Sequence, residues 1–178
     1  MCSRYHVDNK TIAEMQKIVS IVEKCALTCS GEIHPSDNAP VIDNSTAGLR
    51  LRTMTWGFTK ADGKGLLINA RAETADQKAA FRESLTHRRC VIPASRFYEW
   101  DKAKRKTTFS RPDSRLLCFA GVYRVDDSGQ RFVILTTEAN ESVLPVHDRM
   151  PLIIGREQIP EWIYDDSQTQ TILRQKMP

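Results

Sequence analysis

The alternation of hydrophobic and polar positions predicts one early helix followed by a long region of strands. Asp8 suits an N-cap, and the apolar side chains after it recur at helical spacing: Ile12, Met15, Ile18, Val19 and Val22. A short strand is expected before this helix, at residues 3–6. The proline, asparagine and aspartate residues within residues 30–40 predict a loop there.

From residue 49 onward, short runs rich in β-branched and aromatic residues end at turn residues, which is typical of strands. The expected strands cover residues 49–58, 66–70, 90–100, 106–110, 116–125, 131–136 and 152–154. One amphipathic helix interrupts them, with Thr74 as its N-cap and Phe81 and Leu85 on its inner face. A short helix near residues 159–164 has Pro160 in its first turn. This order predicts an α+β fold, with a mainly antiparallel, curved, barrel-like sheet and a few peripheral helices.

Composition sets the class of protein without revealing its chemistry. The chain has 178 residues, 40% hydrophobic and 27% charged, which predicts one globular domain over residues 1–178. No apolar run approaches the roughly 20 residues that span a bilayer, and no signal-peptide pattern opens the chain, so we expect a cytoplasmic protein. The formal charge of +4 permits an anionic partner such as nucleic acid but does not establish one.

The five cysteines are odd in number and lack the spacing of a disulfide framework, which indicates reduced thiols. The gap between Cys25 and Cys29 is one that zinc sites also use, and His34 follows, but no second pair of ligands comes at the required spacing. Two small residues one helical turn apart explain the same pattern. We therefore expect no metal site at these residues.

Cys2 becomes chemically distinctive if Met1 is removed, which a small second residue permits. Its α-amine and thiol then form a 1,2-aminothiol. The amine condenses with an aldehyde to a Schiff base, and the thiol closes a five-membered thiazolidine ring. The thiolate is the reactive form, so a nearby base or cation would help. A reduced cysteine that lies near a terminus by chance is the plain alternative.

Polar residues gather in segments beyond what strands and turns require. These segments are the N-terminus with Cys2 and Arg4, then residues 68–74, 93–100, 136–140 and 146–151. Glu99 is either a strand residue facing water or, between two aromatic residues, a proton carrier with a raised pKa. His147 is either an ordinary surface or core histidine or a group suited to proton transfer near neutral pH.

The other candidates also have plain structural alternatives. Asn69 at a strand end could satisfy turn backbone, and Arg71 and Arg149 could be surface charges. Trp56 is of a type most often found in the core, although a half-exposed tryptophan could stack on a base.

In this order, the segments closely resemble the SOS-response-associated peptidase (SRAP) family, from Cys2 to about Ile154. The matching pieces are the Met-Cys-x-Arg-Tyr opening, Asn-Ala-Pro at 38–40, Trp-Gly at 56–57, Asn-Ala-Arg-Ala-Glu-Thr at 69–74, the segment 90–100, Phe-Ala-Gly at 119–121, Thr-Glu-Ala-Asn at 137–140 and His-Asp-Arg-Met-Pro at 147–151. Each piece is weak alone, but together they make a specific signal.

The resemblance implies a covalent sensor of abasic sites in single-stranded DNA, acting in the DNA damage (SOS) response as a cytoplasmic monomer. Cys2 would form the thiazolidine crosslink. Three residues match the family's other active-site positions: Asn69, Glu99 and His147. Three match its phosphate-binding arginines: Arg4, Arg71 and Arg149. Two match residues along its DNA groove: Pro40 and Trp56. Glu99 would move protons at the amine, His147 would assist opening of the sugar ring, and Asn69 would orient the sugar or the amine. No metal or organic cofactor is implied.

The chain departs from the family at three places. Ser3 replaces the usual glycine, and Ala80 stands where some members carry a bulkier residue that wedges against DNA bases. The chain ends at Pro178, which predicts that the family's last C-terminal segment is missing. Two other functions stay open. One is a thiol hydrolase or autopeptidase that uses Cys2 with His147 and Glu99 on an amide and could remove Met1. The other is a noncovalent nucleic-acid or interaction module.

Overall fold

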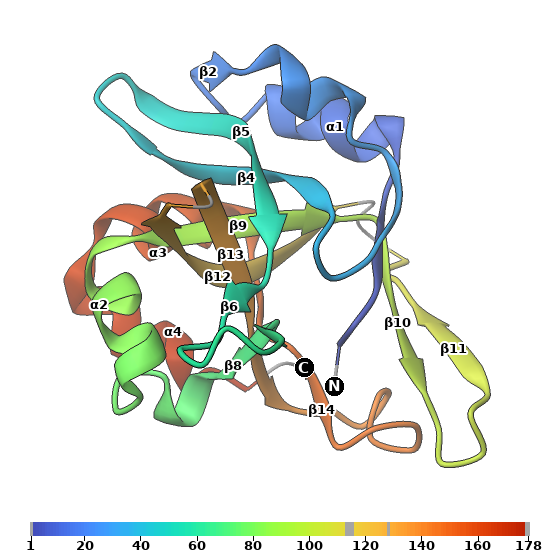
Figure 1. Cartoon of the computed structure of the whole chain (residues 1–178). Helices are drawn as coiled ribbons and strands as arrows, with labels where there is room; N and C mark the ends of the chain where they lie inside the picture. The colour runs from blue at the N-terminus through green and yellow to red at the C-terminus, as the bar shows by residue number, and fades with distance from the viewer. Residues whose placement is uncertain (1, 113–115, 128, 177–178) are drawn as a thin grey trace.

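A closed barrel of five strands forms the centre of the computed structural model, which describes residues 2–112, 116–127 and 129–176 (Figure 1). Its strands are β4 (Asn38–Ser45), β5 (Gly48–Trp56), β9 (Arg89–Ala94), β12 (Leu117–Asp126) and β13 (Gly129–Glu138). Neighbours are antiparallel in the order β13–β12–β9–β4–β5. A parallel pairing of β5 with β13 then closes the ring. The predicted α+β fold with a barrel-like core is therefore confirmed.

Aromatic side chains pack tightly inside this core. The Trp56 ring stacks on Phe132, with centroids 6.2 Å apart and planes 6° from parallel, and the Tyr5 ring meets Trp56 edge-on at 5.2 Å. The indole Nε1 of Trp56 donates a 2.9 Å hydrogen bond to the carbonyl of Ile68, which satisfies its one polar atom. Trp56 is fully buried. It therefore belongs to the centre of the core.

A second, four-stranded antiparallel sheet stands beside the barrel. Its order is β11 (Lys106–Phe109), β10 (Arg96–Trp100), β1 (Tyr5–Val7) and β3 (Gly31–Ile33). Figure 1 shows the β10–β11 hairpin reaching away from the barrel next to the N-terminal segment. Because β1 lies beside β10, the residues just before β1 lie against the strand that carries Glu99.

Short strands complete the sheets. β8 (Asn69–Arg71) pairs in parallel with β13, and β14 (Arg149–Pro151) pairs antiparallel with the end of the same strand. The remaining short strands are β2 (Ile21–Val22) on β5, β15 (Ile153–Ile154) on β12, and the pair β6 (Phe58–Thr59) and β7 (Leu66–Leu67). Through β13, two predicted site segments come together at one end of the barrel.

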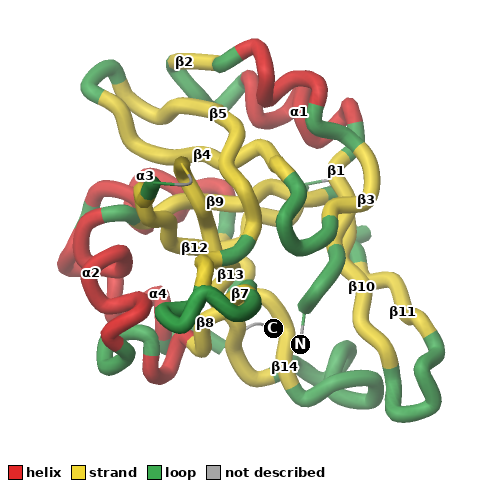
Figure 2. Tube along the Cα trace, viewed as in Figure 1, coloured by secondary structure: helices red, strands yellow, loops and turns green. Residues whose placement is uncertain are grey.

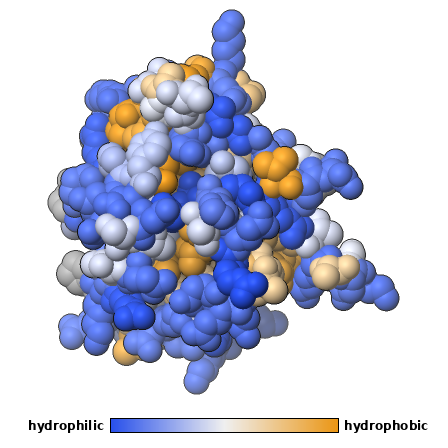
Figure 3. Space-filling model, turned by 90° about the vertical axis from the view of Figure 1, so that its left-hand side faces the viewer, coloured by the Kyte–Doolittle hydropathy of each residue, from blue (hydrophilic) through white to orange (hydrophobic). Residues whose placement is uncertain are grey.

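The helices lie outside the barrel: α1 (Asn9–Gln16), α2 (Ala79–His87), α3 (Ile159–Tyr164) and α4 (Thr169–Leu173). Figure 2 shows α2, α3 and α4 along one side and α1 apart from them. That helical side is mainly hydrophilic, with small separate hydrophobic spots (Figure 3). None of the helices in the described part of the chain is long and apolar enough to cross a membrane.

Several predicted elements need correction. The first helix has the predicted cap, because Asp8 Oδ1 accepts a 2.7 Å hydrogen bond from the backbone N–H of Thr11, but it ends at Gln16. The expected continuation instead forms β2 against β5, where the β-branched pair Ile21–Val22 gains ladder partners. The loop expected at residues 30–40 is wrong, since β3 and the start of β4 occupy most of it.

The second helix begins at Ala79, and Thr74 lies instead in the short 3-10 helix Ala72–Thr74. The strand predicted over 90–100 divides at Ser95, whose backbone N–H donates to the carbonyl of His6 at 2.8 Å. The helix predicted at 159–164 is confirmed as α3. The expectations about Met1 and Pro178 lie outside the described residues.

Candidate functional site

Cys2 is completely buried at the head of the β1 segment. Its carbonyl oxygen accepts a 2.7 Å hydrogen bond from Nδ2 of Asn69, which is the first residue of β8. Its Sγ lies 3.8 Å from the carbonyl of Arg4. The backbone N–H of Tyr98 donates to that same carbonyl at 3.1 Å, which ties the segment to β10. The backbone carbonyls of Cys2 and Arg4 are thus held by β8 and β10, two strands from distant parts of the sequence.

Glu99 lies on β10 and is only 2% exposed. Burial raises the pKa of its carboxyl above the ordinary value, and Asp148 acts in the same direction, whereas His147 acts to lower it. The charge of Glu99 in turn acts on Cys2. Glu99 therefore lies within electrostatic reach of both Cys2 and His147, the three residues that the family resemblance places in one site.

The Cys2 thiol is held in its protonated form. Burial, and next the negative charge of Glu99, raise its pKa to about 12, although the contact with the Arg4 carbonyl acts in the opposite sense. At neutral pH the thiolate population is consequently very small.

His147 lies in the connection between β13 and β14. Its Nδ1 accepts a 3.0 Å hydrogen bond from the backbone N–H of Arg149, so the neutral ring carries its proton on Nε2. Oδ1 of Asp148 is also 3.0 Å from Nδ1 and would accept a proton from it in the imidazolium. Both contacts meet the ring at Nδ1 and so fix the orientation of His147.

Asn69 offers the site a second polar atom. Because Nδ2 faces the Cys2 carbonyl, Oδ1 is the free end of the amide; it is buried and has no hydrogen-bond partner among the described residues. A buried acceptor of this kind normally finds a donor from water or a ligand. Oδ1 is therefore placed to accept a hydrogen bond from a bound hydroxyl or amine.

The three predicted phosphate-binding arginines have different surroundings. Arg71 is exposed at the end of β8. Arg4 lies over the Trp100 ring at 4.9 Å and pairs with Glu32 at 2.9 Å, with a third of its side chain exposed. Arg149 is only 13% exposed and forms a bidentate pair with Glu73. Of these three arginines, Arg71 and Arg4 keep more exposed surface than Arg149.

The two residues expected along a DNA groove are both buried. Trp56 fills the core and satisfies its indole N–H internally, and Pro40 lies within β4 opposite Thr53 of β5. Neither presents a surface that a DNA strand could contact. This corrects the expectation from sequence, because Trp56 packs inside the barrel against Phe132 and Pro40 is covered on the opposite face of the β4–β5 ladder.

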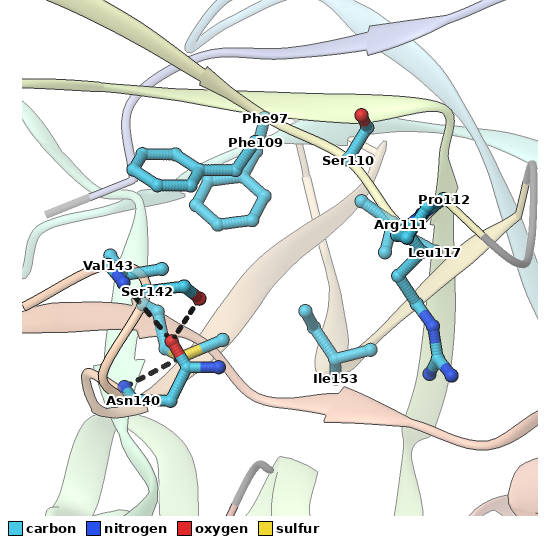
Figure 4. A pocket seen from close by; sticks show the side chains of 11 residues that line it. Phe97, Phe109, Ser110, Arg111, Pro112, Leu117, Asn140, Ser142, Val143 and Ile153 are labelled. Carbon is cyan, nitrogen blue, oxygen red and sulfur yellow. Dashed lines mark hydrogen bonds between the residues drawn. The ribbon is translucent and has the colours of Figure 1, made fainter.

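A pocket of about 870 Å³ lies beside His147. Residues 100–103 and 105 of the β10–β11 hairpin and residues 144–148 line its walls. A separate, mainly apolar cavity of about 260 Å³ lies behind the same loop, where Phe97 and Phe109 stack near Val143 and Ile153 (Figure 4). None of the predicted site residues lines that second cavity, and His147 is the one that lines the first.

Sequence reasoning gave no role to two residues that the structure brings to the site, Glu73 and Asp148. Both lie inside segments that it singled out, but their contacts come from chain folding and left no separate signal. Among the described residues, no group of three or more histidine, cysteine, aspartate or glutamate side chains is arranged to hold a metal ion.

Comparison with known proteins decides the family. Residues 1–177 match the family described as SOS response associated peptidase (SRAP). The chain belongs to the SRAP family. A relative named abasic site processing protein YoaM, from Bacillus subtilis, is 38% identical over 148 residues, which cover 75% of this chain and 65% of YoaM. Another, abasic site processing protein YoqW from the same organism, is 34% identical over 183 residues, which cover 92% of this chain and 80% of YoqW.

Solved structures share the fold of this chain at low sequence identity. A crystal structure of a Bacteroides thetaiotaomicron protein has a TM-score of 0.81 at 22% identity, covering 97% of this chain and 86% of that one. One from Bordetella bronchiseptica has a TM-score of 0.80 at 22% identity, covering 99% and 95%.

Proposed function

We propose that this SRAP protein senses abasic sites in single-stranded DNA and bonds to them covalently through Cys2, once removal of Met1 has freed its α-amine. The observation that carries the proposal is the buried Cys2, held by Asn69 with Glu99 and His147 within electrostatic reach. Membership in the family and the names of the bacterial relatives support the abasic site as the substrate.

The reaction would use the aldehyde that an abasic deoxyribose presents at C1′ after ring opening. The amine of Cys2 adds to this carbon, and loss of one water gives an iminium. The thiol sulfur then bonds to the same carbon while its proton is transferred away and the C=N electron pair returns to nitrogen, which closes the thiazolidine. An α-amine has an ordinary pKa of about 7.7 to 8.0, so near neutral pH a base is needed to free much of it.

Each neighbouring side chain has a step suited to its surroundings. Glu99, whose pKa is raised by burial, takes a proton from the amine and returns one to the departing hydroxyl. His147 moves the proton that opens the sugar ring. Asn69 fixes the Cys2 carbonyl with Nδ2, and its Oδ1 accepts a hydrogen bond from the sugar or the amine.

The state of the thiol favours attack by the amine first. A cysteine hydrolase depends on a thiolate, and burial raises the pKa of the Cys2 thiol to about 12. In the crosslinking route the thiol acts only after the iminium has formed at the neighbouring carbon, so a free thiolate is not required at the start. This supports crosslinking over amide hydrolysis.

Arg71 and Arg4 are the cations that we assign to DNA phosphates, because both keep exposed surface close to the segments that carry the site. Phosphate contacts position a strand without reading its sequence, so little sequence preference and a marked salt dependence follow. In this proposal the protein acts as a cytoplasmic monomer without a metal or organic cofactor.

A denaturing gel tests the proposal. Labelled single-stranded DNA with one abasic site is incubated with the wild type, Cys2→Ala and Cys90→Ala, a matched control at another buried cysteine. We expect a slowly migrating species that resists detergent with the wild type and Cys90→Ala, and none with Cys2→Ala or with undamaged DNA. No such species from protein that lacks Met1 would contradict the proposal, and Cys2-dependent turnover of a peptide amide would favour the hydrolase instead.

A further inference from the structure

We propose that the tip of the β10–β11 hairpin, residues 101–106, binds phosphates of the DNA strand on one side of the abasic nucleotide. The inference rests on the proposed function for its partner, and it adds a binding surface that lies between the segments resembling the SRAP family. The tip carries four cations within five residues: Lys102, Lys104, Arg105 and Lys106. A dense basic run of this kind is the electrostatic footprint of a nucleic-acid contact.

The tip is open to a partner. The hairpin stands out from the body of the protein (Figure 1), and residues 102–106 are all exposed. Two of the cations are already paired, because Lys106 lies 3.1 Å from a Glu32 carboxylate oxygen and Arg105 lies 2.7 Å from one of Asp101. Neither Lys102 nor Lys104 has an ion-pair partner within the described part of the chain. These two lysines therefore keep their charge available.

The backbone of the tip is held in one arrangement by Asp101. Its carbonyl accepts a 2.9 Å hydrogen bond from the N–H of Lys104, and its Oδ1 accepts one of 2.9 Å from the N–H of Arg105. Its Oδ2 accepts a third bond, of 2.7 Å, from Nε of Arg105. The tip is thus ordered before any ligand arrives, which reduces the entropy that binding costs.

The backbone at Lys104 points to a role for its side chain. Its φ angle is +61°, in the left-handed region where residues other than glycine are uncommon. Glycine adopts this conformation without the steric penalty of a Cβ. A lysine at a position where glycine fits better indicates that the side chain serves something other than the fold.

A hollow of about 870 Å³ joins the hairpin to the candidate site. Lys102 and Arg105 line it on one side and His147 on the other. Trp100 also lines it, and the Arg4 guanidinium lies over the Trp100 ring at 4.9 Å. A strand whose abasic sugar lies beside His147 can therefore follow cations from Arg4 to the hairpin tip.

A second hollow, of about 980 Å³, offers the strand a less favourable path. Leu144 lines both hollows and so forms the ridge between them. The hollow beside His147 has two basic and two acidic residues in its walls, and the adjoining tip adds Lys104 and Lys106. The second hollow has an excess of acidic residues, with three carboxylates and two cations: Glu73, Glu138, Glu141, Arg174 and Lys176. Phosphates are repelled by such an excess, which favours the hairpin side.

The test compares a double variant, Lys102→Gln with Lys104→Gln, with a matched control, Lys78→Gln with Arg82→Gln. The control removes the same charge from exposed residues at the start of α2, on the helical side. Fluorescence anisotropy measures binding of a labelled, undamaged single strand at several salt concentrations. We expect the hairpin variant to bind about tenfold more weakly and its salt slope to fall by about 1.4, because each single-strand phosphate contact contributes roughly 0.7. The control should keep the wild-type slope.

Two further readouts separate a DNA contact from other roles. At saturating abasic DNA, the hairpin variant should form the adduct within about twofold of the wild-type rate, because Cys2, Glu99 and His147 are unchanged. Lys104→Gly should weaken binding, yet unfold at a temperature no lower than the wild type, because glycine suits the positive φ. Binding to undamaged strands needs no crosslink, so a wild type that binds but forms no adduct would refute the proposed function alone.

Two results would overturn the assignment of the hairpin. One is wild-type affinity and salt slope in the hairpin double variant. The other is an equal loss of affinity in the Lys78→Gln, Arg82→Gln control, which would show that the net charge of the protein matters and the position of the lysines does not.

Discussion

The side-chain amide of Asn69 donates a 2.7 Å hydrogen bond to the carbonyl oxygen of Cys2, across 67 positions of the sequence. The contact fixes the backbone at the residue whose amine and thiol would both react. It also leaves the buried Oδ1 of the same amide directed away from that carbonyl. One side chain thus orients the nucleophile and offers an acceptor to its substrate.

Replacing Asn69 with alanine should slow adduct formation about fivefold without abolishing it, because one neutral hydrogen bond contributes roughly 1 kcal/mol. The rate is measured from time courses on denaturing gels with excess abasic DNA. Asn38→Ala is the matched control, since that exposed asparagine bonds to Thr55 on the β4–β5 ladder. Equal rates for Asn69→Ala and the wild type would remove Asn69 from the mechanism.

The cysteines should react with iodoacetamide in the order of their exposure and pKa. Cys25 is exposed and should be alkylated first. Cys2 and Cys118, buried with pKa values raised to about 12, should react only slowly below pH 9, since the thiolate fraction is small there. Peptide mapping by mass spectrometry gives the order. Alkylation of Cys2 in the folded protein as fast as Cys25 would show that its thiol is not buried as described.

Glu99→Gln should become more stable relative to the wild type as pH rises. The pKa of Glu99 is raised by burial, so the unfolded chain ionises before the folded one. Below the ordinary glutamate pKa the wild type keeps the full contribution of its protonated side chain, and it loses that contribution as pH rises through the raised value. Urea unfolding at several pH values measures the difference. A gap between the two proteins that stays constant with pH would contradict the raised pKa.

Arg89 should be a main support of the helical side. Its buried guanidinium donates to the carbonyls of Leu85 and Trp162, at the ends of α2 and α3, and pairs with Asp166. Arg89→Met leaves those carbonyls unpaired and should lower the free energy of unfolding by about 3 kcal/mol. Asp166→Asn should cost less than about 1 kcal/mol, because the Asp166 side chain is 79% exposed. Equal losses would show that the ion pair matters more than the carbonyls.

Local patterns predicted the elements that depend on local sequence. The Asp8 cap and the helix at 159–164 were foreseen, because capping and a proline in the first turn are properties of a few adjacent residues. The early end of α1 was missed, since β5 recruits Ile21–Val22 as a strand through contacts that are distant in sequence. The parallel β5–β13 pairing that closes the barrel was also missed, because it joins residues far apart in the sequence and gives no local sequence signal.

For the candidate site, too, local motifs predicted some features and contacts distant in sequence decided the others. Its reactive side chains could be named from motifs, and the structure brings Cys2, Asn69, Glu99 and His147 together. Which tryptophan or arginine stays accessible could not be predicted, because exposure is decided by packing. Trp56 became core and Arg149 became half of an ion pair for that reason.

Intact mass spectrometry gives the most direct test of the crosslink. The purified protein is measured before and after incubation with a single-stranded oligonucleotide that bears one abasic site, alongside Cys2→Ala and an undamaged strand. The starting mass reports whether Met1 is present. We predict an added mass equal to the oligonucleotide minus one water, absent from both controls. An unchanged mass in protein that already lacks Met1 would contradict covalent sensing by Cys2.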